Sequence, residues 1–78
     1  MRQFFFHLKS RSRLLVDCSG YVLLDRDEAR DRAFCVVRRC IETGAVQGDW
    51  RNWHVHVVDE EGEEVFVTPF SDVVGRLH

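Results

Sequence analysis

The stretch "DRDEARDRAFCVVRRCIETG", residues 25–44, decides the fold because it carries the clearest helical pattern of the 78-residue chain. Asp25 is suited to the N-cap, and Glu28 follows it at the spacing that a capping box requires. Gly44 is suited to the left-handed position just past a helix end. Between these ends, apolar residues recur every three or four positions and predict one apolar stripe. The stripe consists of Ala29, Ala33, Val36, Val37, Cys40 and Ile41.

Segments typical of strands lie on both sides of the helix. "QFFFHL" (3–8) is bulky and aromatic, and "RLLV" (13–16) returns after a polar turn. "WHVHVV" (53–58) and "EEVFVT" (63–68) are joined by "DEEG" and predict a hairpin. The whole chain, 1–78, is therefore predicted to be a single α+β domain. It has two layers, an antiparallel sheet of three to four strands and one helix packed on one face, in β-β-α-β-β order.

The alternation of side chains along these strands predicts two faces of the sheet, because successive residues of a strand point to opposite sides. The face against the helix is predicted to contain Phe4, Phe6, Leu8, Trp53, Val55, Val57, Val65 and Val67. The uncovered face is predicted to contain Phe5, His7, His54, His56, Val58, Phe66 and Thr68. The C-terminal residues, 70–78, predict a short helical turn or a frayed end.

Composition excludes some classes of protein. A formal net charge of -2 gives no general attraction to phosphate or to anionic lipid, so nucleic acid is disfavoured as a partner. No window approaches the roughly 18 apolar residues of a membrane span, and none is expected. The three cysteines form no CxxC pair, which argues against a disulfide framework and predicts a cytoplasmic protein. Cys40 lies in the apolar stripe and is predicted to be buried, whereas Cys35 lies nearly opposite and should be exposed.

The uncovered face is the predicted functional surface, because a contiguous apolar patch with a polar rim usually marks a contact site. Its aromatic and imidazole side chains form the predicted partner-binding set. The set is Phe5, His7, His54, His56 and Phe66. No motif for a nucleophile, a phosphate loop or a cofactor occurs, so we expect no catalytic residues, no cofactor and no enzymatic activity.

Two other readings of this face stay open. His54 and His56 offer two imidazoles on one strand face, and His7 could supply the third ligand of a metal site. Surface imidazoles opposite the core are the simpler interpretation.

The second alternative is a nucleic-acid surface. It would combine the basic residues Lys9, Arg11 and Arg13 with base stacking on Phe5 and Phe66. The sequence motifs of the usual stacking modules are absent.

Several segments in this order resemble a known family. They are "RQFFFHL" (2–8), "DCSG" (17–20), the helix start "DRDEARDRA" (25–33) and "WHVHVVDEEGEEVFVTPFSD" (53–72). The layout is similar to a family of small bacterial proteins, frequent in rhizobia and their relatives, that is catalogued as a domain of unknown function. The resemblance implies a small, soluble, intracellular protein and supplies no catalytic residues. That family has other polar residues where this chain has two histidines, which argues against a metal site there.

The sequence therefore predicts a non-enzymatic protein-interaction module or homodimer that uses the uncovered face or an edge strand. A nucleic-acid-associated regulator and a small histidine-based metal-binding protein are the alternatives.

Overall fold

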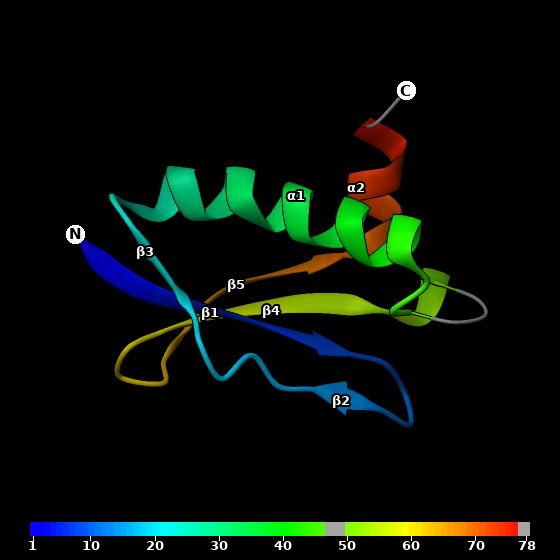
Figure 1. Ribbon diagram of the computed structural model, residues 1–78, viewed down its shortest axis with the longest axis horizontal. Coiled ribbons are helices and arrows are strands. Elements are labelled where there is room, and N and C mark those ends of the chain that lie inside the picture. The colour runs from blue at the N-terminus through cyan, green and yellow to red at the C-terminus, as the bar shows by residue number, and fades with distance from the viewer. Residues whose placement is uncertain (47–49, 77–78) are drawn as a thin grey trace.

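The computed structural model describes residues 1–46 and 50–76. Five strands, two helices and one short 3-10 turn follow one another along these residues. They are β1 (Arg2–Lys9), β2 (Leu14–Leu15), β3 (Tyr21–Leu23), α1 (Arg26–Thr43), η1 (Trp50–Asn52), β4 (His54–Asp59), β5 (Glu64–Pro69) and α2 (Phe70–Arg76). Figure 1 shows both helices on one side of the sheet.

The sheet is antiparallel and built around β1. Its order is β2-β1-β4-β5, and β3 also pairs with β1. Strands β2 and β3 thus share one edge of β1, whereas β4 occupies the other edge. The predicted α+β class with a helix on one face is confirmed. The sheet has five strands rather than three to four, because the segment ahead of the helix contributes two short strands.

Helix α1 begins and ends at the predicted residues. The Asp25 carboxylate accepts the backbone N–H of Glu28 at 3.0 Å, and the Glu28 carboxylate accepts that of Leu24 at 3.4 Å. At the other end Gly44 adopts a φ of 75° and donates its N–H to the Ile41 carbonyl at 3.4 Å. Both ends thereby satisfy backbone groups that a helix leaves without partners.

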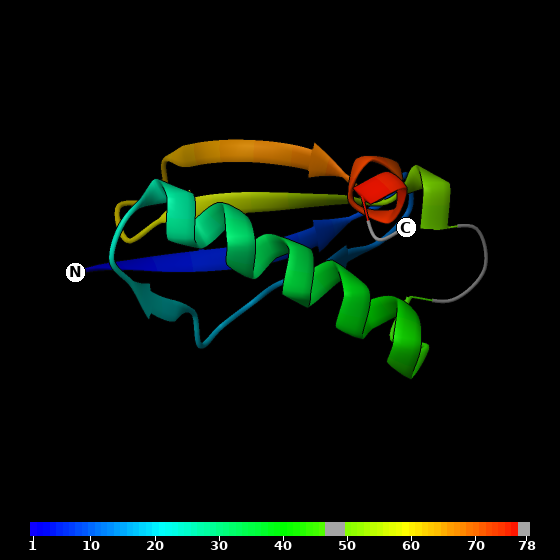
Figure 2. The same ribbon diagram turned by 90° about the horizontal axis from the view of Figure 1, so that it is seen from above.

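The core lies between α1 and the sheet, and α1 crosses the strands diagonally (Figure 2). Ala29, Ala33 and Val37 are the buried residues of the helix, and the small alanines allow its backbone to approach the strands. Burying a large apolar side chain contributes about 1.5–3 kcal/mol. The six residues of β1 and its neighbours that were predicted for this face are buried: Phe4, Phe6, Leu8, Trp53, Val55 and Val57.

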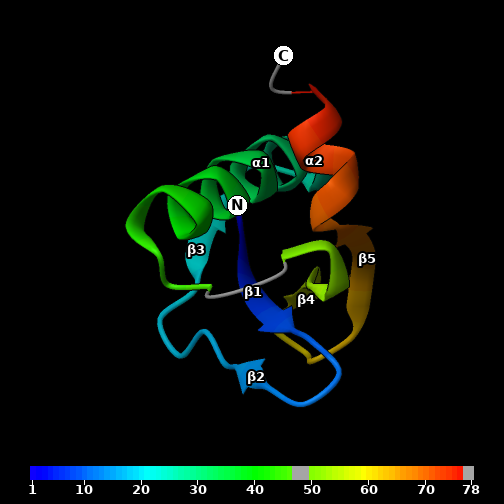
Figure 3. The same ribbon diagram turned by 90° about the vertical axis from the view of Figure 1, so that its right-hand side faces the viewer.

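The C-terminal segment forms a second helix, which the sequence left open as a helical turn or a frayed end. Phe70 and Val73 of α2 are fully buried. Phe70 donates its N–H to the Trp53 carbonyl at 3.0 Å, and the two rings lie 6.3 Å apart. Figure 3 shows α2 beside α1 on the same side of the sheet, so the described helices leave the other side uncovered. Residues 77 and 78 lie outside the described part.

The predicted faces of β5 are wrong for three residues because of a β-bulge. Val57 pairs with Phe66, but Val58 pairs with Glu64, so Val65 is an extra residue in β5. Two successive residues then face the same way, and the alternation after them is reversed. Val65 and Phe66 both pack against the core, and Thr68 pairs with buried Val55. Val67 pairs with His56 and lies on the uncovered face.

Candidate functional site on the uncovered face and its edge

Four of the five predicted partner-binding residues lie together on the uncovered face. Across β1 and β4, His7 pairs with His56 and Phe5 pairs with Val58. His54 lies two residues before His56 in β4 and so projects from the same face. All of these side chains are half-buried. This arrangement is the predicted one.

Phe66, the fifth predicted residue, lies on the opposite side of the sheet. The guanidinium carbon of Arg30, from α1, lies 5.8 Å from the centre of its ring. Phe66 is therefore removed from the candidate surface. The stacking platform of the nucleic-acid alternative is wrong for the same reason, since Phe5 and Phe66 face opposite ways.

His7 is engaged in holding a loop. The backbone N–H of Asp17 donates to Nδ1 of His7 at 3.0 Å, which requires that nitrogen to be unprotonated. The ring also stacks on Phe5, with 6.4 Å between centroids and 12° between planes. The sequence did not reveal this role, because nothing local links His7 to a residue ten positions later.

Asp17 organises the loop between β2 and β3. Its carboxylate accepts the N–H groups of Phe6, Ser19 and Gly20 at 3.0–3.1 Å. Burial alone would raise the pKa of this carboxyl, but the three backbone N–H donors outweigh burial and hold the pKa below its usual value. The Asp17 carboxylate thus links the loop between β2 and β3 to the backbone of β1. "DCSG" was predicted only as a turn.

Gly20 brings this loop against Phe5. Its φ is 71°, and a Cβ there would lie 2.9 Å from Cε1 of Phe5 and 3.0 Å from the Phe4 carbonyl oxygen. Only glycine combines this backbone conformation with so close an approach. Phe5 is consequently covered in part by the loop, which narrows the uncovered face on that side.

The three histidines of the face do not form a metal-binding group. Within residues 1–46 and 50–76, no cluster of three or more His, Cys, Asp or Glu side chains is placed to hold a metal ion. His54 and His56 have ring centroids 6.4 Å apart, and Nδ1 of His56 lies 3.5 Å from a carboxylate oxygen of Glu64. His7 has its Nδ1 occupied by the loop.

The acidic hairpin tip is held by one of its own carboxylates. Asp59 is buried, and its Oδ1 accepts the N–H groups of Glu61 and Glu63, each at 2.9 Å. Its other oxygen lies 3.2 Å from the Arg2 guanidinium. Gly62 adopts a φ of 83° in the same turn. The neighbouring glutamates are exposed, as expected for a solvated tip.

The cysteines carry free thiols. Cys35 is exposed, as predicted. Cys40 is half-buried, and burial raises the pKa of its thiol, so it stays protonated and unreactive at neutral pH.

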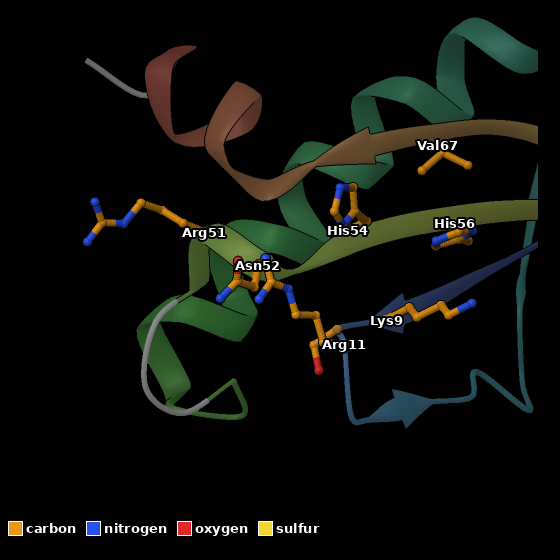
Figure 4. A pocket seen from close by; sticks show the side chains of 8 residues that line it. Lys9, Arg11, Arg51, Asn52, His54, His56 and Val67 are labelled. Carbon is orange, nitrogen blue, oxygen red and sulfur yellow. The ribbon is translucent and has the colours of Figure 1, made fainter.

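A shallow pocket of about 420 Å³ lies at the end of the uncovered face where β1 ends and β4 begins. Its lining is mostly basic, and among the described residues no acidic side chain lines it. The basic and apolar lining residues are Lys9, Arg11, Arg51, His54, His56 and Val67. Figure 4 shows the two imidazoles projecting from β4 into the same region as Val67 of β5. The sequence did not predict this pocket, because its residues come from four separate segments.

The edge of the sheet formed by β2 and β3 is unusually apolar. We use the name edge stripe for four residues that are each 57–62% exposed: Leu14, Val16, Val22 and Leu24. Leu14 pairs with Lys9 and Val22 pairs with Gln3, which puts both side chains on the uncovered side of the sheet. Single exposed apolar residues are ordinary, but several that share one edge of a sheet indicate a contact surface.

These features define a class of protein: a two-layer α+β domain whose antiparallel sheet has one main helix against it and a half-apolar, half-basic opposite side. A family model described as a domain of unknown function (DUF6894) matches residues 3–71. The chain belongs to this family, as its resemblance to a domain of unknown function predicted. Comparisons with curated proteins and with solved structures find no match.

The residues that carried the resemblance have structural roles here. His7 and Asp17 hold the loop, Asp59 forms the hairpin turn, and Phe70 fills the core between the helices. Across residues 1–46 and 50–76, neither helix has the length and apolar character needed to cross a bilayer.

Proposed function

We propose that the domain is a non-enzymatic protein-interaction module of the cytoplasm that forms a homodimer through the edge stripe. The observation that carries the proposal is the row of exposed leucine and valine side chains along one edge of the sheet. Burying these side chains in a contact would stabilise the contact by about 25 cal/mol for each Å² of apolar surface removed from water. The polar residues singled out by sequence, such as His7 and Asp59, are occupied with backbone hydrogen bonds.

The backbone at the same edge supports pairing between strands. In the part of the chain that the structure describes, β2 and β3 pair with β1 and with no further strand. Their outer N–H and C=O groups are thus available to another strand, and exposed strand edges readily take one up. An isologous contact would join β2 of one copy to β3 of its partner in antiparallel orientation.

Charges at the two ends of the edge stripe favour a second copy as the partner. Exposed Arg13 directly precedes Leu14, whereas exposed Asp25 and Asp27 follow Leu24. The eight residues of β1 separate these ends by about 26 Å. A two-fold axis through the middle of the stripe reverses its direction, so the basic end of one copy meets the acidic end of the other.

Sedimentation equilibrium of the full chain tests the proposal. The wild-type protein should dimerise with rising concentration, and Val22→Lys should be monomeric because it puts a charge into the apolar contact. Val22 is 61% exposed, so the substitution should change the free energy of unfolding by no more than about 0.5 kcal/mol.

Val67→Lys is the matched control, because it makes the same change on the opposite edge strand, β5. It should dimerise like the wild type, and both variants should keep the wild-type circular dichroism. A monomeric wild type would refute the homodimer, and a dimer lost only in Val67→Lys would refute the edge stripe as its contact.

A further inference from the structure

The pocket on the uncovered face is lined mostly by basic side chains, although the chain as a whole has a negative net charge. The chain has a formal net charge of -2, yet the pocket is lined by three permanently charged cations and two histidines. Four acidic residues of the same hairpin lie instead at its far tip: Asp59, Glu60, Glu61 and Glu63. A fifth, Glu64, lies 3.5 Å from Nδ1 of His56, a residue that lines the pocket. Like charges held together repel one another, and an anion between them relieves that repulsion.

We propose that this pocket binds a phosphate group, either as the free ion or as a small phosphate monoester. The site goes beyond the proposed homodimer, since its residues come from β1, η1, β4 and β5 and none belongs to the edge stripe. Its volume of about 420 Å³ is within the range of pockets that hold small molecules.

The geometry gives the anion several donors from different directions. Lys9 pairs with His54 across β1 and β4, so both side chains project from the uncovered face, and Figure 4 shows the Lys9 side chain extending toward the His56 side of the pocket. His56 projects on the same side two residues later. Arg11 extends from the turn after β1 toward Asn52, which closes one end of the pocket (Figure 4). Guanidinium and ammonium groups form shorter and stronger hydrogen bonds to phosphate oxygens than neutral donors do.

Other charged groups near the pocket are compatible with this assignment. The Arg51 guanidinium points away from the other labelled side chains (Figure 4), so it is not among the groups proposed to contact the anion. Glu64 is the acidic neighbour of His56, at 3.5 Å, and its side chain is 59% exposed. A side chain so exposed can turn toward water when an anion arrives. Val67 provides an apolar floor against which the carbon skeleton of a phosphate ester can rest.

Chemical-shift titration of the full-length, 15N-labelled chain tests the proposal. The probes are inorganic phosphate and glycerol 3-phosphate, with sodium chloride at matched ionic strength as the reference. Phosphate should cause saturable shifts at the amides of Arg11, Asn52 and His54. Arg11→Gln should weaken phosphate binding about tenfold, because it removes a charge-assisted hydrogen bond.

Arg13→Gln is the matched control, since it removes the same charge from the same turn but from outside the pocket. It should leave phosphate affinity unchanged. Tighter binding of glycerol 3-phosphate would assign the pocket to esters, and equal binding would assign it to the free ion.

Equal weakening by both variants, or shifts that chloride reproduces, would overturn the site in favour of general charge screening. A single-stranded oligonucleotide that binds more tightly and shifts amides well beyond the pocket would replace it with a nucleic-acid surface. Dimerisation is measured separately by sedimentation, so failure of either proposal leaves the other intact.

Discussion

His7, Asp17 and Gly20 show how few residues determine the shape of the uncovered face. A single carboxylate accepts three backbone N–H groups, and a single imidazole accepts a fourth. These bonds hold the loop between β2 and β3 against Phe5. The residues of the edge stripe come before and after the segment from Asp17 to Gly20, so the same bonds position them. The pKa of Asp17 lies below its usual value, so these bonds to its charged form persist throughout the neutral range.

Gly20→Ala should lower the free energy of unfolding by roughly 2–5 kcal/mol. A left-handed backbone costs an alanine about 1–2 kcal/mol, and crowding against Phe5 adds about 1–3 kcal/mol. Gly62→Ala is the control, because it has a similar φ of 83° with nothing within 4 Å of the added Cβ. It should cost only about 1–2 kcal/mol. Urea denaturation measures both, and equal losses would mean that the loop does not press on Phe5.

At the scale of elements, the sequence predicted the helices and strands correctly where a periodic pattern was long and uninterrupted. The helix 26–43 could be predicted with both ends because Asp25 and Gly44 have local, recognisable chemistry. The strands β1 and β4 kept their alternation, so the histidine face was also predictable.

The remaining elements depended on contacts that no local pattern reports. In β5 the bulge at Val65 reversed the faces of the residues that follow, which a strict period of two cannot anticipate. Strand β2 lies within the segment 13–16 predicted as a short strand, whereas β3, three residues long, is too short for a periodic signal. The basic pocket was missed because Arg11, Asn52 and Val67 are distant in sequence.

Helix α2 is short and carries little helical signal, so its stability must come from packing. Phe70→Ala should therefore lower the free energy of unfolding by about 3–5 kcal/mol, since Phe70 is fully buried against Trp53. Ser71→Ala, on the exposed side of the same helix, should change it by less than about 0.5 kcal/mol. Thermal or urea unfolding measures both variants. A loss below 1 kcal/mol for Phe70→Ala would show that α2 is not part of the cooperative core.

At the scale of the whole molecule, the two sides of the sheet differ. Both helices pack on one side of the sheet (Figure 3). The described residues of the other side are apolar along one edge and basic at one end. In the described residues no helix lies on the other side of the five-stranded sheet, and part of the apolar surface there is exposed.

The most direct measurement of the central claim is the change in amide chemical shifts when the 15N-labelled protein is diluted. The account predicts that dilution shifts the amides of residues 14–24, where the edge stripe lies, and leaves the exposed side of α1 at Arg38 and Glu42 unchanged. Shifts confined to α1, or none over a wide range of concentration, would contradict it.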